Sequence, residues 1–336
     1  MSSAYQYYMF TLLVYFGVNT IAAWALNLQY GISGVLNFAF IMFQAMGAYI
    51  AGVLTLGPPD PTSFQRYILG ASLPFPLPWL AAAAVGALLA LVVGAFALRP
   101  SRPDYQAMVM LVVSIIAATL VVSQGGWFNG NYGLVAIPKP FQDALNLDLL
   151  GYGWFYVGLT AAVVLVVFAF VNRLTGSPWA RRLRAMRENP EALEALGVNV
   201  WAERMKVYVI GGALAALSGA VLAQFIGAWS PGSWGTAETF LYFAVIIIGG
   251  AGNNFGAMVG SALVLGVFQE VLRYLPSFGY AGLAEAIQFM LLGVLLLAFL
   301  WWRPIGLFPE RRRRFGKPPE PLDRFAPADG SARGVP

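Results

Sequence analysis

Long apolar runs without charge, separated by short polar segments, dominate the pattern of the chain. No charged side chain occurs in residues 1–59, and the same holds for 67–98, 105–137, 149–172, 207–237 and 239–269. A helix needs about 20 consecutive apolar residues to cross a bilayer, and each of these runs is longer. The pattern predicts an all-α, polytopic integral membrane protein with about 8–10 transmembrane helices, some of them broken or re-entrant at Gly/Asn-rich elements.

Two of the apolar runs are interrupted by glycine and asparagine instead of by charge. The first interruption is NLQYGISGVLN, residues 27–37, and the second is GGAGNN, residues 249–254. Irregular backbone at membrane depth is tolerated only where protein or a water-filled cavity covers it. We expect the chain to turn at 27–37, and we expect 239–249 and 255–272 to form the two arms of a broken hairpin. The other crossings, which bring the total to about nine, are expected near residues 79–98, 105–123, 153–172, 207–228 and 285–302.

These interruptions also supply candidate polar groups for a transport path. Broken helices in transporters place free backbone groups near the substrate, and uncharged polar side chains beside them are candidates for a gate. The spacing of Gly252, Gly256 and Gly260 favours helix packing, because glycines four residues apart share one helical face and let another helix approach. The candidate substrate path or gate comprises Asn37, Gln44, Gly249, Gly250, Gly252, Asn253 and Asn254.

Composition narrows the possible chemistry. The 336 residues are 59% hydrophobic and 10% charged, whereas a soluble domain is about 25% charged. Cysteine and histidine are both absent, which excludes disulfides, Cys/His metal sites and imidazole acid–base catalysis. The sequence also lacks a phosphate-binding loop and a nucleophile elbow. We therefore expect no catalytic residue, no metal and no cofactor in this chain.

Positive charge is concentrated in two segments, which predicts the orientation. Residues 173–206 and 303–336 together hold 15 of the 20 Lys and Arg residues. Basic residues near the ends of spans accumulate on the cytoplasmic side. We expect both segments to be cytoplasmic, with the N-terminus and the Pro-rich segment 57–78 outside. Residues 1–305 then form the transmembrane domain, and 306–336 a basic, Pro-rich cytoplasmic tail that is disordered rather than bound to nucleic acid.

The basic segment 173–206 carries the signals of two short helices. Ser177-Pro178 is typical of a helix cap followed by proline in the first turn, which predicts a helix over 179–188. Asn189-Pro190 repeats the signal, and Gly197 marks the end of a second helix after Leu196. Two separately capped helices predict an ordered docking element rather than a linker.

The second of these helices resembles a known docking motif. Residues 191–197, EALEALG, are similar to the E-A-A-x-x-x-G loop with which permeases of ABC importers dock on their ATPase, with Leu193 in place of the second alanine. The surrounding sequence from RAMRENPEALEALGVNVWAERMK to SPGSW, followed by IIIGGAGNNFGAMVGSALVLG, is similar to permease subunits of branched-chain amino acid ABC importers. RPDY at 102–105 and SGVLNFAFIMFQAMGAY near the N-terminus extend the resemblance to most of residues 25–305.

This resemblance implies a multi-pass permease, surrounded by lipid, in the plasma (inner) membrane of a bacterium or archaeon. It implies that the chain imports a branched-chain amino acid as one part of a larger importer. The other parts would be a second permease subunit, homologous or identical, cytoplasmic ABC ATPase subunits and an extracytoplasmic solute-binding protein. Phe40 stands where the family often has histidine, and relatives also carry urea, short amides and other small amino acids, so the identity of the solute stays open. The residues implied to dock on the ATPase are Arg181, Arg184, Arg187, Glu191, Ala192, Glu194 and Gly197.

Two other functions stay open at this point. A self-sufficient secondary transporter of small amino acids or amides would use a proton or sodium gradient and would need no ATPase. Ionisable groups for such coupling are scarce, because Glu238, Glu270 and Glu285 all lie at the edges of predicted spans. An intramembrane enzyme is the third alternative, and it would release a product from the purified chain.

Overall fold

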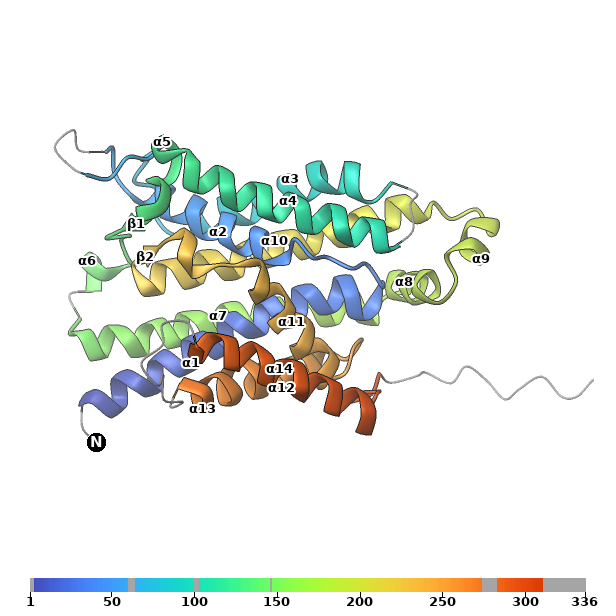
Figure 1. The fold of residues 1–336 in the computed structure, drawn as a ribbon. Helices are drawn as coiled ribbons and strands as arrows, with labels where there is room; N and C mark the ends of the chain where they lie inside the picture. The colour runs from blue at the N-terminus through green and yellow to red at the C-terminus, as the bar shows by residue number, and fades with distance from the viewer. Residues whose placement is uncertain (1–2, 60–63, 100–102, 146, 274–282, 311–336) are drawn as a thin grey trace, which may run out of the picture.

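The computed structural model describes residues 3–59, 64–99, 103–145, 147–273 and 283–310, most of them helical (Figure 1). In the first half, the elements are α1 Ser3–Leu26, the π-helix η1 Asn27–Ile32, α2 Phe40–Thr55, α3 Leu77–Ala97, α4 Pro103–Ser123, α5 Gly125–Phe128, the 3-10 helix η2 Gly130–Tyr132, β1 Leu134–Val135, α6 Gln142–Leu145 and α7 Leu149–Gly176. In the second half, they are α8 Pro178–Glu188, α9 Pro190–Ala195, α10 Val200–Ile226, β2 Ala228–Trp229, the 3-10 helix η3 Pro231–Ser233, α11 Thr236–Gly249, α12 Asn254–Ser261, the π-helix η4 Ala262–Phe268, α13 Gln269–Arg273 and α14 Leu283–Trp302.

The described helices confirm the all-α, polytopic fold. Within the ranges above, seven helices are long and apolar enough to cross a membrane, and two shorter apolar helices, Phe40–Thr55 and Ala286–Trp302, accompany them. The bundle has two distinct ends (Figure 1). The N-terminus, α6, β1 and β2 lie at one end, termed the β end, and α8 and α9 lie at the other, termed the α8–α9 end.

The first interruption lies further along the chain than the sequence indicates. Helix α1 passes directly into η1 and ends at Ile32, so the turn predicted from residue 27 begins only at Ser33. The backbone stays helical because the side chains of Asn27 and Gln29 find partners elsewhere in the protein. Gly34, with φ of 74°, then adopts the left-handed conformation at the turn before α2.

The second interruption is a break between α11 and α12, as the glycines and asparagines predict. Gly250 and Gly252 have φ values of 112° and 85°, a region that favours glycine, and α12 begins at Asn254. Helix α11 begins at Thr236, so the first arm is longer than the predicted 239–249. Beyond the break, α12, η4 and α13 follow one another without interruption.

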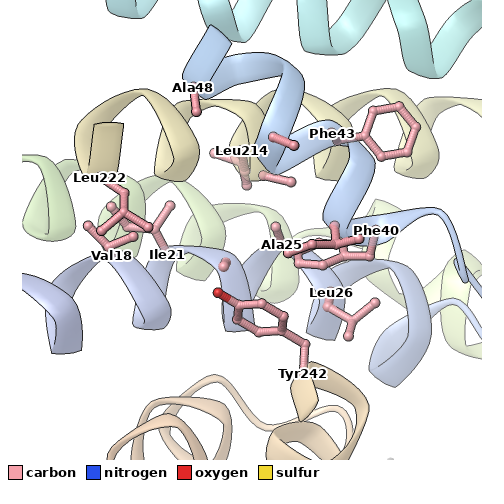
Figure 2. Packing of buried hydrophobic residues seen from close by; sticks show 14 of the residues in the cluster. Val18, Ile21, Ala25, Leu26, Phe40, Phe43, Ala48, Leu214, Leu222 and Tyr242 are labelled. Atoms are coloured by element: carbon pink, nitrogen blue, oxygen red, sulfur yellow. The ribbon is translucent and has the colours of Figure 1, made fainter. Parts of the chain in front are cut away.

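Helix α10 is the centre of the bundle and packs against α1, α2 and α3. Glycines allow this close packing, because a Cβ atom on Gly219 of α10 would overlap the carbonyl oxygen of Gln44 in α2. In the same way, a Cβ atom on Gly47 would overlap the carbonyl oxygen of Ala216. The two backbones are therefore in direct contact. Figure 2 shows the apolar side chains of α1, α2 and α10 meeting Tyr242 of α11 beside this contact.

The β end is closed by loops and a small antiparallel sheet. Leu134 of β1 pairs with Trp229 of β2, and Val135 pairs with Ala228. The Pro-rich segment predicted to lie outside joins this structure through Tyr67, which forms a bridge with Phe128. The loop before α3 and the α8–α9 pair therefore lie at opposite ends of the bundle (Figure 1).

Candidate functional site

Helices α8 and α9 are held against the bundle by an apolar inner face. Ala180, Leu183 and Met186 of α8 are buried, and so is Leu193 of α9. Apart from Ala180, these side chains form a separate hydrophobic cluster with residues of η1 and of the first turns of α10. The α8–α9 pair therefore contacts the first interruption of the bundle directly.

The ends of these short helices agree with two of their three predicted signals. Asn189 caps α9 by accepting a hydrogen bond from the Ala192 amide at 3.0 Å, and Gly197 has the left-handed φ of 81°. Ser177 does not cap α8 with its side chain. Its hydroxyl donates instead to the carbonyl oxygen of Leu174 at 2.6 Å, which also accepts from the Ser177 amide at 3.1 Å.

The predicted docking residues divide into two groups. Arg181, Glu191, Ala192, Glu194 and Gly197 are exposed, and the exposed Leu196, which was not among the predicted residues, lies beside them with 81% of its surface accessible. These six residues are termed the docking tip. Beside them runs a groove lined by Leu98, Val198, Trp201 and Arg204, among others.

Arg184 and Arg187 belong to the other group and point into the protein. The Arg187 guanidinium donates to the carbonyl oxygen of Gly31 and, at 2.7 Å, to the carboxylate of Glu310. The Arg184 guanidinium donates to the other carboxylate oxygen of Glu310. Sequence reasoning missed Glu310, whose only signal is its place immediately before the four consecutive arginines 311–314.

The two interruptions of the bundle meet each other close to these arginines. Asn27 accepts a hydrogen bond from the Gly252 amide at 2.9 Å and donates to the side-chain oxygen of Asn254 at 3.1 Å. The Asn254 amide nitrogen in turn donates to Asn172 at 2.8 Å and to Thr175 at 3.0 Å, both in α7. Residues 27, 172, 175, 252 and 254 thus form a polar junction in which each asparagine side chain has protein partners.

Other residues at the second interruption cap α12 or let it pack closely on α11. Asn253 caps α12 by accepting hydrogen bonds from the amides of Phe255 and Gly256. Gly256 and Gly260 face α11, where a Cβ atom on either would overlap the backbone oxygen of Gly249 or Val245. The prediction that Gly252 shares this helical face needs correction, because Gly252 lies before α12 in a left-handed conformation.

Asn37 and Gln44 lie in separate buried clusters. The Asn37 amide donates to Gln29 at 2.9 Å, and the Gln44 amide donates to the hydroxyl of Tyr242 at 3.2 Å. The Tyr242 hydroxyl donates onward to Asn19 at 3.0 Å. Both side-chain amides therefore lie near the interruptions in the sequence and have hydrogen-bond partners inside the protein.

The short helices α2 and α11 approach each other near their N-termini. The Ile41 amide of α2 donates to the hydroxyl of Thr239 at 3.3 Å. Phe38 packs on Phe240 and Phe243, with ring centres 5.4 Å and 5.2 Å apart. Phe240 is exposed. Sequence reasoning missed these aromatic residues, which lie beside the N-termini of α2 and α11.

Replacing Asn27 with leucine should lower the stability of the protein. The substitution keeps a branched side chain but removes its polar atoms, which leaves the buried Gly252 amide and the Asn254 side-chain oxygen without a partner, at a cost of about 1–3 kcal/mol. Thermal unfolding in detergent should show the loss as a decrease in Tm of a few degrees. Asn131→Leu is the matched control, because Asn131 is exposed at the β end, and its Tm should stay that of the parent. An unchanged Tm for Asn27→Leu would contradict the role of the junction.

An apolar bundle that is interrupted twice and carries an ordered charged loop at one end defines a polytopic permease, the membrane-spanning part of a transport system. The described residues include no group of acidic side chains that could hold a metal ion. The chain belongs to the family described as the permease component of the branched-chain amino acid transport system, whose profile matches residues 8–300. This confirms the family resemblance seen in the sequence.

Individual relatives agree with the family. The chain is 26% identical to the probable branched-chain amino acid transport permease protein LivM of Methanocaldococcus jannaschii, over 89% of this chain and 93% of that one. It is 29% identical to the high-affinity branched-chain amino acid transport system permease protein LivM of Escherichia coli, over 85% and 67%. The guanosine ABC transporter permease protein NupQ of Bacillus subtilis is 27% identical, over 71% and 73%. No solved structure matches the chain significantly.

Proposed function

We propose that this permease imports a branched-chain amino acid and is driven by ABC ATPase subunits that dock on α8 and α9. The observation that carries the proposal is the division of the α8–α9 pair into a buried inner face and an exposed docking tip. The inner face contacts the first interruption, so a force applied at the tip would reach the broken part of the bundle. The partner subunits would hydrolyse ATP, and this chain would provide the path for the solute.

The charge distribution supports a cytoplasmic α8–α9 end. The four arginines of α8, together with Arg173 at the end of α7 and Arg204 and Lys206 at the start of α10, gather positive charge there, and such charge accumulates on the cytoplasmic side. The N-terminus and the β end would then face outward in the plasma membrane of a bacterium or archaeon. Exposed apolar side chains along α3, α4 and α7 suit contact with lipid.

The aromatic residues beside α2 and α11 suit an amphipathic solute. Phe38, Phe240 and Phe243 offer an apolar surface for a branched side chain. The N-terminus of α2, which has no acidic residue in its first turn, lies beside them, and half-helix N-termini bind substrate carboxylates in other transporters. The relatives named as branched-chain amino acid permeases favour the same solute, and the guanosine permease is the source of the second candidate, a nucleoside.

Two further partners complete the proposed importer. A second permease, identical or homologous, would pair with this chain so that the path lies between them. A solute-binding protein would deliver the solute at the β end, where a hollow is lined by Phe75, Phe141 and Gln224, among others, and by Lys139. Burial lowers the pKa of the Lys139 ammonium group.

Reconstitution tests the proposal against its alternatives. The complete importer in proteoliposomes should take up labelled leucine only when ATP is supplied on the side of the ATPase. Uptake by this chain alone, driven by a proton or sodium gradient, would support a secondary transporter instead. Release of a modified product by the purified chain would support an enzyme. Uptake of guanosine and not of leucine would identify the solute as a nucleoside instead of a branched-chain amino acid.

Replacing Gly197 with valine should weaken the docking tip without changing its contacts. Gly197 has a left-handed φ of 81° and no atom within 4 Å of its Cβ position, so the effect is backbone strain alone, about 1–2 kcal/mol. ATP-driven uptake should fall several-fold while the amount of permease in the membrane stays constant. Gly158→Val, at an equally open position on α7 with ordinary φ, should transport normally. Normal uptake by Gly197→Val would exclude docking through this turn.

A further inference from the structure

The segment that follows α14 folds back onto the second interruption of the bundle. Residues 303–310 are termed the C-terminal strap. The amides of Leu307 and Phe308 donate to the carbonyl oxygens of Ile248 and Gly249, at 2.8 Å and 3.0 Å. These carbonyls belong to the last turn of α11, where helical carbonyls lack partners within their own helix. The strap therefore completes the end of α11.

Close contacts hold the strap in this position. Gly306 has a left-handed φ of 76°, and a Cβ atom on it would lie 2.5 Å from the Cα atom of Gly250. Asn253 donates a hydrogen bond to the carbonyl oxygen of Pro309 at 3.2 Å. The ring of Phe308 packs edge-on against Phe255, with centres 5.1 Å apart. The described part of the predicted tail, residues 306–310, is thus packed, and residues 311–336 lie outside the described structure.

Glu310 joins the C-terminal strap to α8. Its carboxylate receives one hydrogen bond from Arg184 and one from Arg187, and the carboxylate side chain is only 18% exposed. Arg187 also donates to the carbonyl oxygen of Gly31 at the end of η1. One carboxylate and one guanidinium thus connect α8, the first interruption and the second interruption.

The charges explain why this connection is specific. Two arginines that share one carboxylate would repel each other without it, and partly buried charge-assisted hydrogen bonds are stronger than neutral ones. The glutamine isostere keeps the shape and one acceptor but loses the negative charge. Position 310 therefore offers a substitution that changes the electrostatic link while preserving the packing of the strap.

We propose that Glu310 is a positioning residue for coupled transport. It keeps α8 joined to both interruptions throughout the transport cycle, so that a displacement of the docking tip moves the broken helices together. Arg184 and Arg187 serve this internal link rather than the ATPase surface. The inference rests on the proposed function, because it assigns the part of the chain that transmits the force of the ATPase.

The number of solute molecules imported per ATP hydrolysed tests this role in the reconstituted importer. In Glu310→Gln, the ATPase should still co-purify and hydrolyse ATP, while the ratio should fall about tenfold. Arg184→Gln should lower the ratio as well, and the double variant should be no worse than the more affected single variant, because residues that share one link are not additive. A ratio in Glu310→Gln equal to that of the parent would overturn the proposal.

A chemical cross-link between residues 184 and 310 tests whether coupling requires a lasting connection between α8 and the strap, or whether the variants simply lose stability. The chain has no cysteine, so Arg184→Cys with Glu310→Cys can be joined by a short bis-methanethiosulfonate reagent, and the parent treated alike controls for partner thiols. The cross-linked importer should recover most of the ratio and lose it again after reduction. A cross-linked importer that stays uncoupled would contradict a persistent link. Failure of the parent to import with ATP would contradict the proposed function itself, which keeps the two failures distinguishable.

Discussion

Replacing Gly219 with leucine is expected to disrupt the bundle severely. The backbones of α2 and α10 touch at this point, and even a Cβ atom on Gly219 would overlap the carbonyl oxygen of Gln44. Because both sides of the contact are backbone, no side-chain rotation relieves the overlap, and the two helices must separate. Overpacking of this kind costs about 3 kcal/mol or more, which corresponds to a decrease in Tm of roughly 5–10 °C.

Size-exclusion chromatography and thermal unfolding in detergent measure this effect. Gly219→Leu should give little monodisperse protein, and the remainder should unfold at a lower temperature. Gly158→Leu is the matched control, because no atom lies within 4 Å of a Cβ atom at that position on the exposed face of α7. The proposed packing would be contradicted if both leucine variants were equally stable.

Replacing Leu196 with aspartate is expected to have the largest effect on transport. Leu196 is 81% exposed at the docking tip, and a large apolar side chain so exposed outside the apolar spans suits a protein partner. A central contact residue contributes about 2 kcal/mol or more to an interface, which is about a 30-fold change in affinity. The new carboxylate would also lie close to Glu191 and Glu194, so the tip would become more acidic.

Titration of the solubilised permease with its ATPase would show the loss of affinity, and uptake in proteoliposomes would fall with it. Leu147→Asp makes the same substitution at an exposed position of the β end, where it should leave ATPase binding unchanged. Normal ATPase binding by Leu196→Asp would remove the docking tip from the proposed mechanism. Equal losses in both variants would indicate a general defect instead.

The crossing helices were predictable because the bilayer imposes a simple requirement on the sequence. Each span needs a long apolar run, and the runs in this chain are separated by charge, proline or the Gly/Asn-rich interruptions at 27–37 and 249–254. The start of α9 was predictable for a local reason, since the Asn189 side chain accepts from an amide only three residues away. Such signals lie within one turn of helix, where sequence reasoning is most reliable.

The polar connections could not be predicted because they join distant parts of the chain. Glu310 contacts Arg184 across 126 residues, and no local pattern indicates which carboxylate will meet which guanidinium. Helical spacing does place Arg184 and Arg187 one position after Leu183 and Met186, which are buried. Arg181 likewise follows the buried Ala180, so this spacing does not separate the two inward arginines from the exposed one.

The end of the first span illustrates the same limit. Asn27 and Gly31 read locally as turn residues, yet the backbone continues as a π-helix through Ile32. The partners that make this possible, Asn254 and Tyr208, come from the other half of the chain. A polar residue at membrane depth marks a turn only when the fold does not supply a partner elsewhere.

The polar junction also determines where compensating mutations should arise. Asn27 and Gly252 are 225 residues apart in the chain, yet one hydrogen bond joins them. In a growth selection that begins from a defect at residue 27, revertants should therefore accumulate at codons 172, 175, 252 and 254 rather than at neighbouring codons. Compensating mutations would therefore occur as pairs, with one change in each half of the gene.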